Sequence, residues 1–448
     1  MSAEQAGEAP NRAITHRRVL KVALPIILSN ATVPILGAVD TGVVGQMGQA
    51  APIGAVGIGA TILMAVFWMF GFLRMGTVGL AAQANGAGNR AEVSAILSRA
   101  LMIAAAAGAV LILVQIPIYL VAFAITPASP EVETLARDYM AIRIWSAPAA
   151  IAGYGLTGWL IALERTRGVL IIQLWMNALN IGLDLWFVLG FGWGVEGVAW
   201  ATFIAEWSGM ALGLWLCRDA FAGPAWRDWP RVFDPTRLRR LAEVSTDILL
   251  RSLMLQVVFV SFILISSMFG DVELAANQIL MQFSFISAYA LDGITYAVQG
   301  MVGEAYGRRD PARVRRAVVV SGRLALAFMV ILAVVFATAG GPMIDVMTNA
   351  PEVRAAARGF LTYLVLAPLF GGASWMLDGV FIGATRTRDM RDMMFISVLI
   401  YGCTAAALVP GLENHGLWIA MLVSYVARAV TLGYRYPALE RSAAKGAQ

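Results

Sequence analysis

The chain has few of the residues from which most active sites are built. It contains two histidines and two cysteines in 448 residues. His16 and His415 are peripheral, and Cys217 and Cys403 lie far apart with no metal-binding or redox spacing. No P-loop pattern for binding nucleotide phosphates occurs. These absences predict that the chain is not an enzyme, has no cofactor and no disulfide framework, and hydrolyses no ATP.

Charge is also scarce. Only 14% of the residues are charged and 59% are hydrophobic, against roughly 25% and 45–50% in soluble domains. The mean hydropathy is +0.73, and apolar runs recur from end to end. We therefore predict an all-α polytopic membrane protein embedded in the lipid bilayer. The net charge of +5 indicates no nucleic-acid partner, because the basic residues gather on one side of the membrane.

Twelve segments have the length that a bilayer requires. Arginine gathers ahead of the first segment and in the connections 218–240, 308–316 and 386–391. The connections at 131–133 and 271–273 are acidic. The positive-inside rule then places both termini in the cytoplasm. The predicted segments are approximately residues 17–44, 53–80, 93–124, 133–162, 169–190, 195–217, 239–267, 274–304, 313–340, 353–384, 391–410 and 416–434.

The second half of the chain restates the first. Residues 79–86 (GLAAQANG) align with residues 300–307 (GMVGEAYG), and residues 158–167 (GWLIALERTR) align with residues 379–388 (GVFIGATRTR). A six-helix repeat keeps its orientation in the membrane, which is the parallel-repeat arrangement of many secondary transporters. The repeat therefore predicts two pseudo-symmetric six-helix lobes.

The predicted lobes have a charged connection between them. The N-terminal lobe covers residues 1–217 and the C-terminal lobe covers residues 239–448. Residues 218–238 contain three prolines and many charges, so we expect a cytoplasmic linker there.

Asp40 is the most informative residue of the chain. It lies in the run ATVPILGAVDTGVV, residues 31–44, which offers no cation to pair with it. A charge at bilayer depth costs at least ~2.5–3.5 kcal/mol, and such residues commonly line ion or substrate pathways. Pro25 and Pro34 interrupt the same segment. We expect them to allow a hinge that responds to Asp40, with a static kink as the alternative.

A second polar group lies on the fifth and sixth segments. Asn180 and Asp184 are four residues apart and share one helix face. Thr202 and Glu206 have the same spacing on the next segment. Carboxylate, amide and hydroxyl oxygens bind a hard monovalent cation or pass protons, and two neighbouring carboxylates resist joint ionisation. These residues therefore predict a cation-coupling site for H⁺ or Na⁺ and no other metal.

The repeat assigns this site to one lobe. The second-half counterparts of Asp40, Asn180 and Asp184 are roughly Phe262, Leu399 and Cys403, none of which is acidic. Architecture alone would not predict such asymmetry, whereas a lobe-specific site would. Hydrogen bonds that merely join helices are the alternative.

Weaker candidates complete the set. Asp292 and Asp378 lie within predicted second-half spans and are candidates to attract cationic substrates. Met254 and Met281 are candidates to line a cavity for varied apolar ligands, although methionine also fills cores and faces lipid. Tyr139 lies near the extracellular end of the fourth segment, where it would reach the cavity.

Several motifs resemble the multidrug and toxic compound extrusion (MATE) transporters. They are residues 39–48 (VDTGVVGQMG), 53–56 (IGAV), 277–283 (NQILMQF), 291–293 (LDG) and 303–305 (GEA). The sequence is most similar to the DNA-damage-inducible F branch of that family, from about residue 15 to residue 435. The resemblance implies a V-shaped, two-lobe transporter in a bacterial inner membrane. It also implies export of cationic or amphipathic compounds in exchange for H⁺ or Na⁺.

The resemblance also implies functional roles for individual residues. The branch's cation site matches Asp40, Asn180, Asp184 and Thr202, and a tyrosine associated with it matches Tyr139. The family's early proline on the first helix matches Pro25. In another branch of the family, a carboxylate lies within the seventh helix. The seventh predicted segment of this chain has no acidic residue at mid-span.

Our expectation is therefore an H⁺-coupled rather than Na⁺-coupled multidrug antiporter, acting as a monomer by alternating access. Two other functions remain open. One is a flippase for lipid-linked or polysaccharide precursors, which a cavity lined by cationic residues would favour. The other is an intramembrane enzyme or a scaffold, and a scaffold would tolerate Asp40→Asn.

Overall fold

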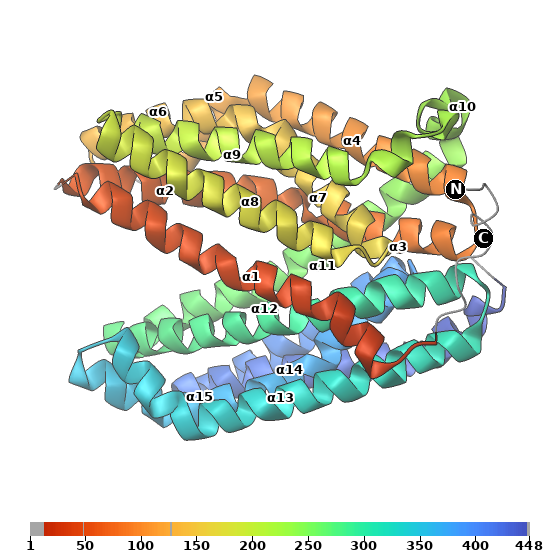
Figure 1. Ribbon diagram of the computed structural model, residues 1–448. Coiled ribbons are helices and arrows are strands. Elements are labelled where there is room, and N and C mark those ends of the chain that lie inside the picture. Colours follow the sequence, from red (N-terminus) through yellow and green to blue (C-terminus); the bar gives the residue numbers. More distant parts are fainter. Residues whose placement is uncertain (1–12, 48, 126–127, 446–448) are drawn as a thin grey trace. The chain divides into compact units, whose positions relative to one another are not determined.

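The computed structural model describes residues 13–47, 49–125 and 128–445, and every regular element in these ranges is helical (Figure 1). The first half contains α1 (His16–Gly45), α2 (Ala50–Trp68), α3 (Phe72–Gly86), α4 (Arg90–Leu113), α5 (Gln115–Ile125), α6 (Pro130–Arg143), α7 (Ala147–Ala162), α8 (Thr166–Asp184) and α9 (Gly194–Leu216). The second half contains α10 (Trp229–Val232), α11 (Pro235–Ser266), α12 (Asp271–Gly307), α13 (Pro311–Met347), α14 (Pro351–Gly383) and α15 (Thr387–Ala443). Short 3₁₀ or π segments are η2 (Met69–Gly71), η3 (Ile144–Ser146), η4 (Leu185–Gly190), η5 (Arg218–Phe221), η6 (Pro224–Arg227) and η7 (Ser267–Phe269).

The predicted spans fall on these helices, in several cases on two consecutive ones. Helix α15 contains two spans, because Glu413 has non-helical backbone angles (φ 48°, ψ −127°) between residues 391–410 and 416–434. Within the described residues, eight helical segments are long and apolar enough to cross a membrane, with α15 counted once.

Local sequence explains where several helices begin. Asn89 ends the turn before α4 and accepts the backbone N–H of Glu92. Ser129 precedes Pro130 at α6, and Asp310 precedes Pro311 at α13. Each of these side chains accepts a backbone N–H of the first turn, and proline at the first position has no N–H to satisfy.

The helices form two compact units, which we describe separately. The C-terminal unit comprises the described residues up to Ile27, residues 82–88 and those from Arg240 onward. The N-terminal unit comprises residues 28–81 and 89–239. These units differ from the predicted lobes in two respects: helix α1 contributes to both units, and the linker belongs to the N-terminal unit. The lobe boundaries stay a prediction.

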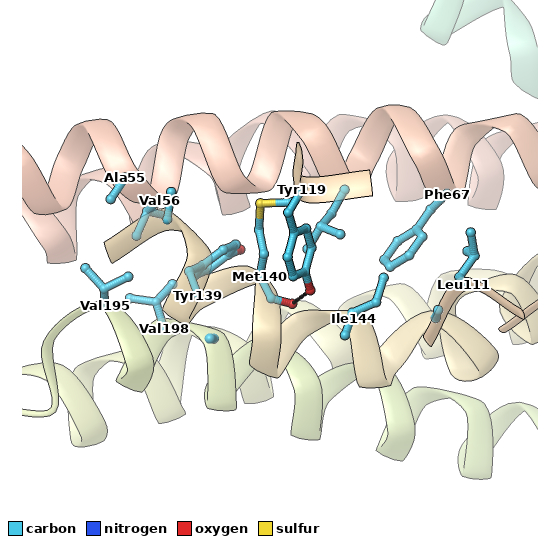
Figure 2. Close-up of a cluster of buried hydrophobic side chains, with 14 of the residues drawn as sticks. Ala55, Val56, Phe67, Leu111, Tyr119, Tyr139, Met140, Ile144, Val195 and Val198 are labelled. Atoms are coloured by element: carbon cyan, nitrogen blue, oxygen red, sulfur yellow. Dashed lines mark hydrogen bonds between the residues drawn. The ribbon is translucent and has the colours of Figure 1, made fainter. Parts of the chain in front are cut away.

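The N-terminal unit has a continuous apolar core, part of which appears in Figure 2. Side chains from α2, α4, α5, α6 and α9 meet there. Tyr119 brings a hydroxyl group into this core, and the hydroxyl donates to the backbone carbonyl of Met140 at 3.0 Å. This bond satisfies a buried hydroxyl and ties α5 to α6.

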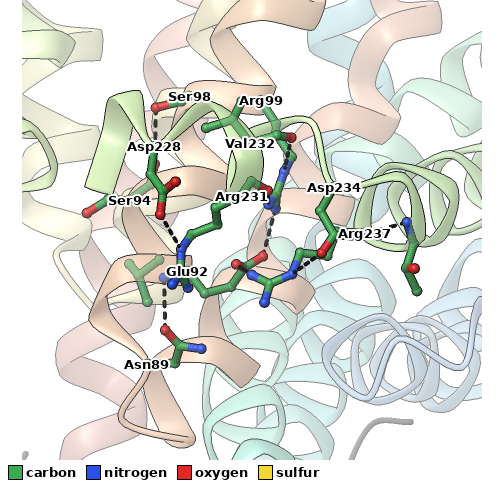
Figure 3. Close-up of polar contacts among 12 residues, drawn as sticks. Asn89, Glu92, Ser94, Ser98, Arg99, Asp228, Arg231, Val232, Asp234 and Arg237 are labelled. Atoms are coloured by element: carbon green, nitrogen blue, oxygen red, sulfur yellow. Dashed lines mark hydrogen bonds and ion pairs between the residues drawn. The ribbon is translucent and has the colours of Figure 1, made fainter. Parts of the chain in front are cut away.

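The linker is anchored to α4 by charge (Figure 3). The guanidinium of Arg99 donates to the backbone carbonyls of Val232 and Arg231, at 2.9 and 2.7 Å. Glu92 pairs with Arg99 at 2.7 Å and also with Arg237. Charge-assisted hydrogen bonds of this kind are stronger than neutral ones. They explain why the linker packs with the N-terminal unit.

The core of the C-terminal unit is organised around Asn277 on α12. Its amide nitrogen donates to Ser266 and Asn414, and its oxygen accepts the indole N–H of Trp418 at 2.8 Å. Trp418 in turn packs edge-on against Phe262, with ring centroids 5.0 Å apart. A fully bonded buried amide joins the helices at a place where apolar packing alone gives little specificity.

Equivalent segments of the two repeats contact each other reciprocally within the C-terminal unit. A β-carbon on Gly86 would lie 2.0 Å from the carbonyl oxygen of Glu304, and one on Gly307 would lie 2.0 Å from that of Gln83. Gln83 and Glu304 are repeat counterparts, as are Gly86 and Gly307. Only glycine permits this crossing of α3 and α12.

Two arginines that are also close to equivalent in the repeat reinforce the crossing. Arg18 on α1 pairs with Glu304 at 2.7 Å, and Arg240 on α11 donates to the side-chain oxygen of Gln83 at 3.0 Å. Each repeat thus supplies an arginine to the other repeat's crossing helix.

Gly86→Ala should destabilise the protein by about 1–3 kcal/mol, because the methyl group collides with backbone that has no room to yield. Gly402→Ala on α15 is the matched control, since a β-carbon there meets nothing within 4 Å. Melting temperatures in detergent should fall for Gly86→Ala and hold or rise for Gly402→Ala. Equal melting temperatures for the two variants would contradict the close crossing.

Candidate functional site

The predicted polar face of α8 is present and buried. Asn180 is 1% exposed and Asp184 is 0% exposed. The amide nitrogen of Asn180 donates to a carboxyl oxygen of Asp184 at 3.1 Å and to the hydroxyl of Thr202 on α9 at 3.3 Å. Three of the predicted residues are therefore joined directly, across two helices.

Asp184 lies where the backbone of α8 changes its winding. Helix α8 ends at Asp184, and η4 continues it as a π-helical turn. Wider turns of this type are uncommon and are frequent at functional sites, because they re-aim side chains within an otherwise regular helix. The winding change thus coincides with the carboxylate that the sequence singles out.

Helix α1 brings Asp40 to the same place. Asp40 is half-buried, and its carboxyl group lies beside that of Asp184. About two turns earlier on both helices, Asn177 donates to the hydroxyl of Thr32 at 2.8 Å. This second bond fixes α1 against α8. Two carboxyl groups that lie together in a low-dielectric interior resist joint ionisation, so the pair is suited to hold a proton or a cation.

Three oxygens of this group lack donors. One side-chain oxygen each of Asp40, Asn180 and Asp184 is buried without a hydrogen-bond partner among the described residues. Buried acceptors are normally satisfied, and exceptions are common at functional sites. Such oxygens suit a proton or a hard cation.

A buried arginine borders the carboxyl pair. Tyr139 on α6 is fully packed, as Figure 2 shows, and its hydroxyl contacts the guanidinium of Arg143. Arg143 forms a two-pronged ion pair with Glu206 on α9, at 2.7 and 3.1 Å. The charge of Arg143 also acts on Asp40. Tyr139 and Arg143 are therefore close enough to both Asp40 and Glu206 for their charges to interact.

Sequence reasoning missed Arg143. It considered Glu206 as a possible free oxygen ligand, whereas Glu206 is already bonded to Arg143. The signal was available, because Arg143 is a cation within an apolar segment and lies one turn after Tyr139. The rule that singled out Asp40 applies equally to Arg143.

The second-half candidates lie in the C-terminal unit. Asp378 is buried and pairs with Arg251 and Arg428, which argues against a cationic ligand at Asp378. Asp292 is half-buried on α12. Met281 is buried in the core of this unit, and Met254 packs against that core. Substrate binding by these four residues stays a prediction.

The hinge prediction concerns α1. Backbone hydrogen bonding keeps α1 helical through Pro25 and Pro34, although the side chain of Pro34 lies outside the described part of the structure. Pro25 is two residues before Ile27, where α1 passes from the C-terminal unit to the N-terminal unit. The hinge stays a prediction, and its place at this transition supports it.

The sequence pattern of the MatE family matches residues 25–186 and 248–405. The chain belongs to this family of MATE transporters. It is 38% identical to DNA damage-inducible protein F of Escherichia coli strain K12, over 92% of this chain and 90% of that protein. It is 26% identical to a probable multidrug resistance protein NorM of Xanthomonas campestris, over 95% of this chain and 94% of that protein.

Solved MATE structures share the fold. The Vibrio cholerae MATE transporter VcmN in the bent form has a TM-score of 0.85 and 19% identity, covering 96% of this chain and 97% of that one. The eukaryotic MATE transporter AtDTX14 has a TM-score of 0.79 and 18% identity, with 96% and 98% covered. The predictions of family, of twelve transmembrane helices in two lobes and of a multi-pass membrane protein are confirmed. Members of this family are transporters rather than enzymes.

The buried Arg143–Glu206 pair gives a testable stability prediction. Arg143→Met should lower the free energy of unfolding by about 3–5 kcal/mol, because it leaves Glu206 buried without a counter-charge. The double variant Arg143→Met/Glu206→Leu should recover most of that loss. Unfolding of the purified protein by titration with a denaturing detergent measures both.

The control is the exposed pair Arg137–Glu133 on the same helix, 2.6 Å apart and about one-third exposed. Exposed pairs of this type contribute about 0–1 kcal/mol, so a parallel double-mutant cycle should show little coupling. Equal coupling in the two cycles would contradict a buried, solvent-shielded pair at Arg143.

Proposed function

We propose that the protein is a cation-coupled multidrug efflux antiporter, with H⁺ rather than Na⁺ as the coupling ion. It would act as a monomer in a bacterial inner membrane, with both termini in the cytoplasm. The observation that carries the proposal is the buried carboxyl pair Asp40–Asp184 beside Asn180 and Thr202. Membership of a transporter family and relatives named as multidrug resistance proteins support export of cationic or amphipathic compounds.

The hydrogen bonds of the site favour H⁺ over Na⁺. Na⁺ would need several oxygens turned towards one point. Asn180 instead directs its amide nitrogen at Asp184 and Thr202, which occupies two of those oxygens. A proton shared by two carboxyl groups needs no such rearrangement. Tyr139 and Arg143 would hold the remaining charge of the site in place.

Coupling follows from the charge of the carboxyl pair. In the outward-open state, uptake of H⁺ by Asp40 and Asp184 would neutralise the site, repack α1 near Pro25 and weaken the binding of a cationic substrate. The substrate leaves, and the protonated carrier returns inward, where H⁺ is released and substrate is loaded. Exchange requires that substrate and H⁺ bind the two states with different affinities, and the effect is reciprocal.

A flippase for lipid-linked precursors is the second candidate. The two buried arginines beside Asp378 are the observation in its favour, because cations would bind a pyrophosphate. The small cavity beside Arg428 has room for a single water-sized group and not for a pyrophosphate. We therefore place the flippase second.

The deciding experiment is efflux of a fluorescent organic cation, ethidium, from proteoliposomes. Imposed pH and Na⁺ gradients are tested separately for wild type and Asp40→Asn. We expect flux in the wild type only under the pH gradient, and a loss of about tenfold or more in Asp40→Asn, because coupling energies typically correspond to factors of 5–150. Asp138→Asn is the matched control, since Asp138 is exposed and adjacent to Tyr139.

Each of the remaining outcomes would contradict a different part of the proposal. If only the Na⁺ gradient drives ethidium flux, the coupling ion is Na⁺ and not H⁺. An Asp40→Asn variant that responds as wild type does would place coupling elsewhere. Absence of ethidium flux under both gradients, with transfer of a labelled lipid-linked pyrophosphate, would favour the flippase.

A further inference from the structure

The C-terminal unit contains a buried charge cluster that the proposed antiport does not use. Asp378 on α14, Arg251 on α11 and Arg428 on α15 are 4%, 8% and 2% exposed. Both guanidinium groups donate to the same oxygen of Asp378. Three helices therefore converge on one carboxylate within the apolar interior.

The cluster carries more positive than negative charge. Arginine stays protonated in proteins, so two guanidinium groups face one carboxylate. Among the described residues, the titratable groups that act on Arg428 are Asp378, Arg251 and Tyr425, and they include no second acid. The Nε atoms of Arg251 and Arg428 are buried without hydrogen-bond partners in the described part of the chain. The cluster therefore has one more positive charge than negative, and the second carboxyl oxygen of Asp378 is also buried without a hydrogen-bond partner among the described residues.

A small cavity adjoins Arg428. It is lined by Leu255, Ser397, Ser424 and Tyr425 together with Arg428, and its volume is about 10 Å³. That volume is about what one water molecule needs. The hydroxyls of Ser397 and Ser424 already donate to backbone carbonyls of α15, so the lining side chains left to donate are Arg428 and Tyr425.

We propose that this cavity binds one small monovalent anion of the chloride class. The anion supplies the missing negative charge and accepts a hydrogen bond from the guanidinium of Arg428. The positive charge of Arg251, on the other side of Asp378, adds electrostatic attraction. The two sites share no residues, because Arg251, Asp378 and Arg428 belong to the C-terminal unit and the Asp40–Asp184 pair belongs to the N-terminal unit. The proposal is therefore independent of the antiport.

The charges of the cluster predict that two substitutions have opposite effects on halide binding. Arg428→Gln removes the donor and the excess charge, so halide affinity should fall by about tenfold or more, as expected for loss of a charged hydrogen bond. Asp378→Asn removes the competing carboxylate and leaves two unpaired arginines, so halide should stabilise this variant more than wild type. A purely structural ion cluster would weaken in both variants without any response to halide.

The experiment measures the melting temperature of the purified full-length protein in detergent against chloride and bromide concentration. Gluconate replaces the halide, so Na⁺ concentration and ionic strength stay constant. Arg391→Gln is the matched control, because Arg391 is also on α15 and pairs with Asp247 and Asp392, away from the cavity. We expect saturable halide stabilisation in wild type and Arg391→Gln, little in Arg428→Gln and more in Asp378→Asn.

Two results would overturn the proposal. One is a wild-type melting temperature that does not depend on halide at constant ionic strength. The other is an equal halide response in wild type, Arg428→Gln and Asp378→Asn. Neither overturning result would alter the ethidium flux driven by a pH gradient, so failure here is distinct from failure of the antiport.

Discussion

The close approach of the Asp40 and Asp184 carboxyl groups is the interaction on which the proposed antiport depends. Two carboxyl groups in an apolar surrounding cannot both be ionised cheaply, so they retain a proton or take up a cation. Asn180 and Thr202 fix the position of Asp184, and Thr32 and Asn177 fix α1 against α8. The polar side chains of this region thus serve to hold two carboxyl groups together.

Charge is arranged differently in the two units. Around Arg143 in the N-terminal unit lie three buried or half-buried acids, Asp40, Asp184 and Glu206, whereas in the C-terminal unit two buried arginines share Asp378. The repeats therefore keep a common helical frame, as the reciprocal crossing at Gly86 and Gly307 shows, while these two charge clusters differ in sign. Duplication supplied the frame, and substitution gave each half a separate ion chemistry.

The sequence was sufficient to predict the helices, the repeat and the residues that surround Asp184. Hydrophobic length defines spans, and spacing of four residues defines a helix face, so Asn180 and Asp184 could be paired without coordinates. Partners on other helices could not be inferred in this way. Glu206 bonds to Arg143, and Asp378 bonds to Arg251 and Arg428, because helix packing decides which side chains meet.

The most direct test of the central claim is the number of protons released when substrate binds. Purified protein in weakly buffered solution would be titrated with ethidium while pH is recorded, for wild type and for Asp184→Asn. The account predicts that wild type releases protons in proportion to the ethidium bound and that Asp184→Asn releases few or none. Equal release from both proteins, or ethidium binding without release from wild type, would contradict a proton held by the Asp40–Asp184 pair.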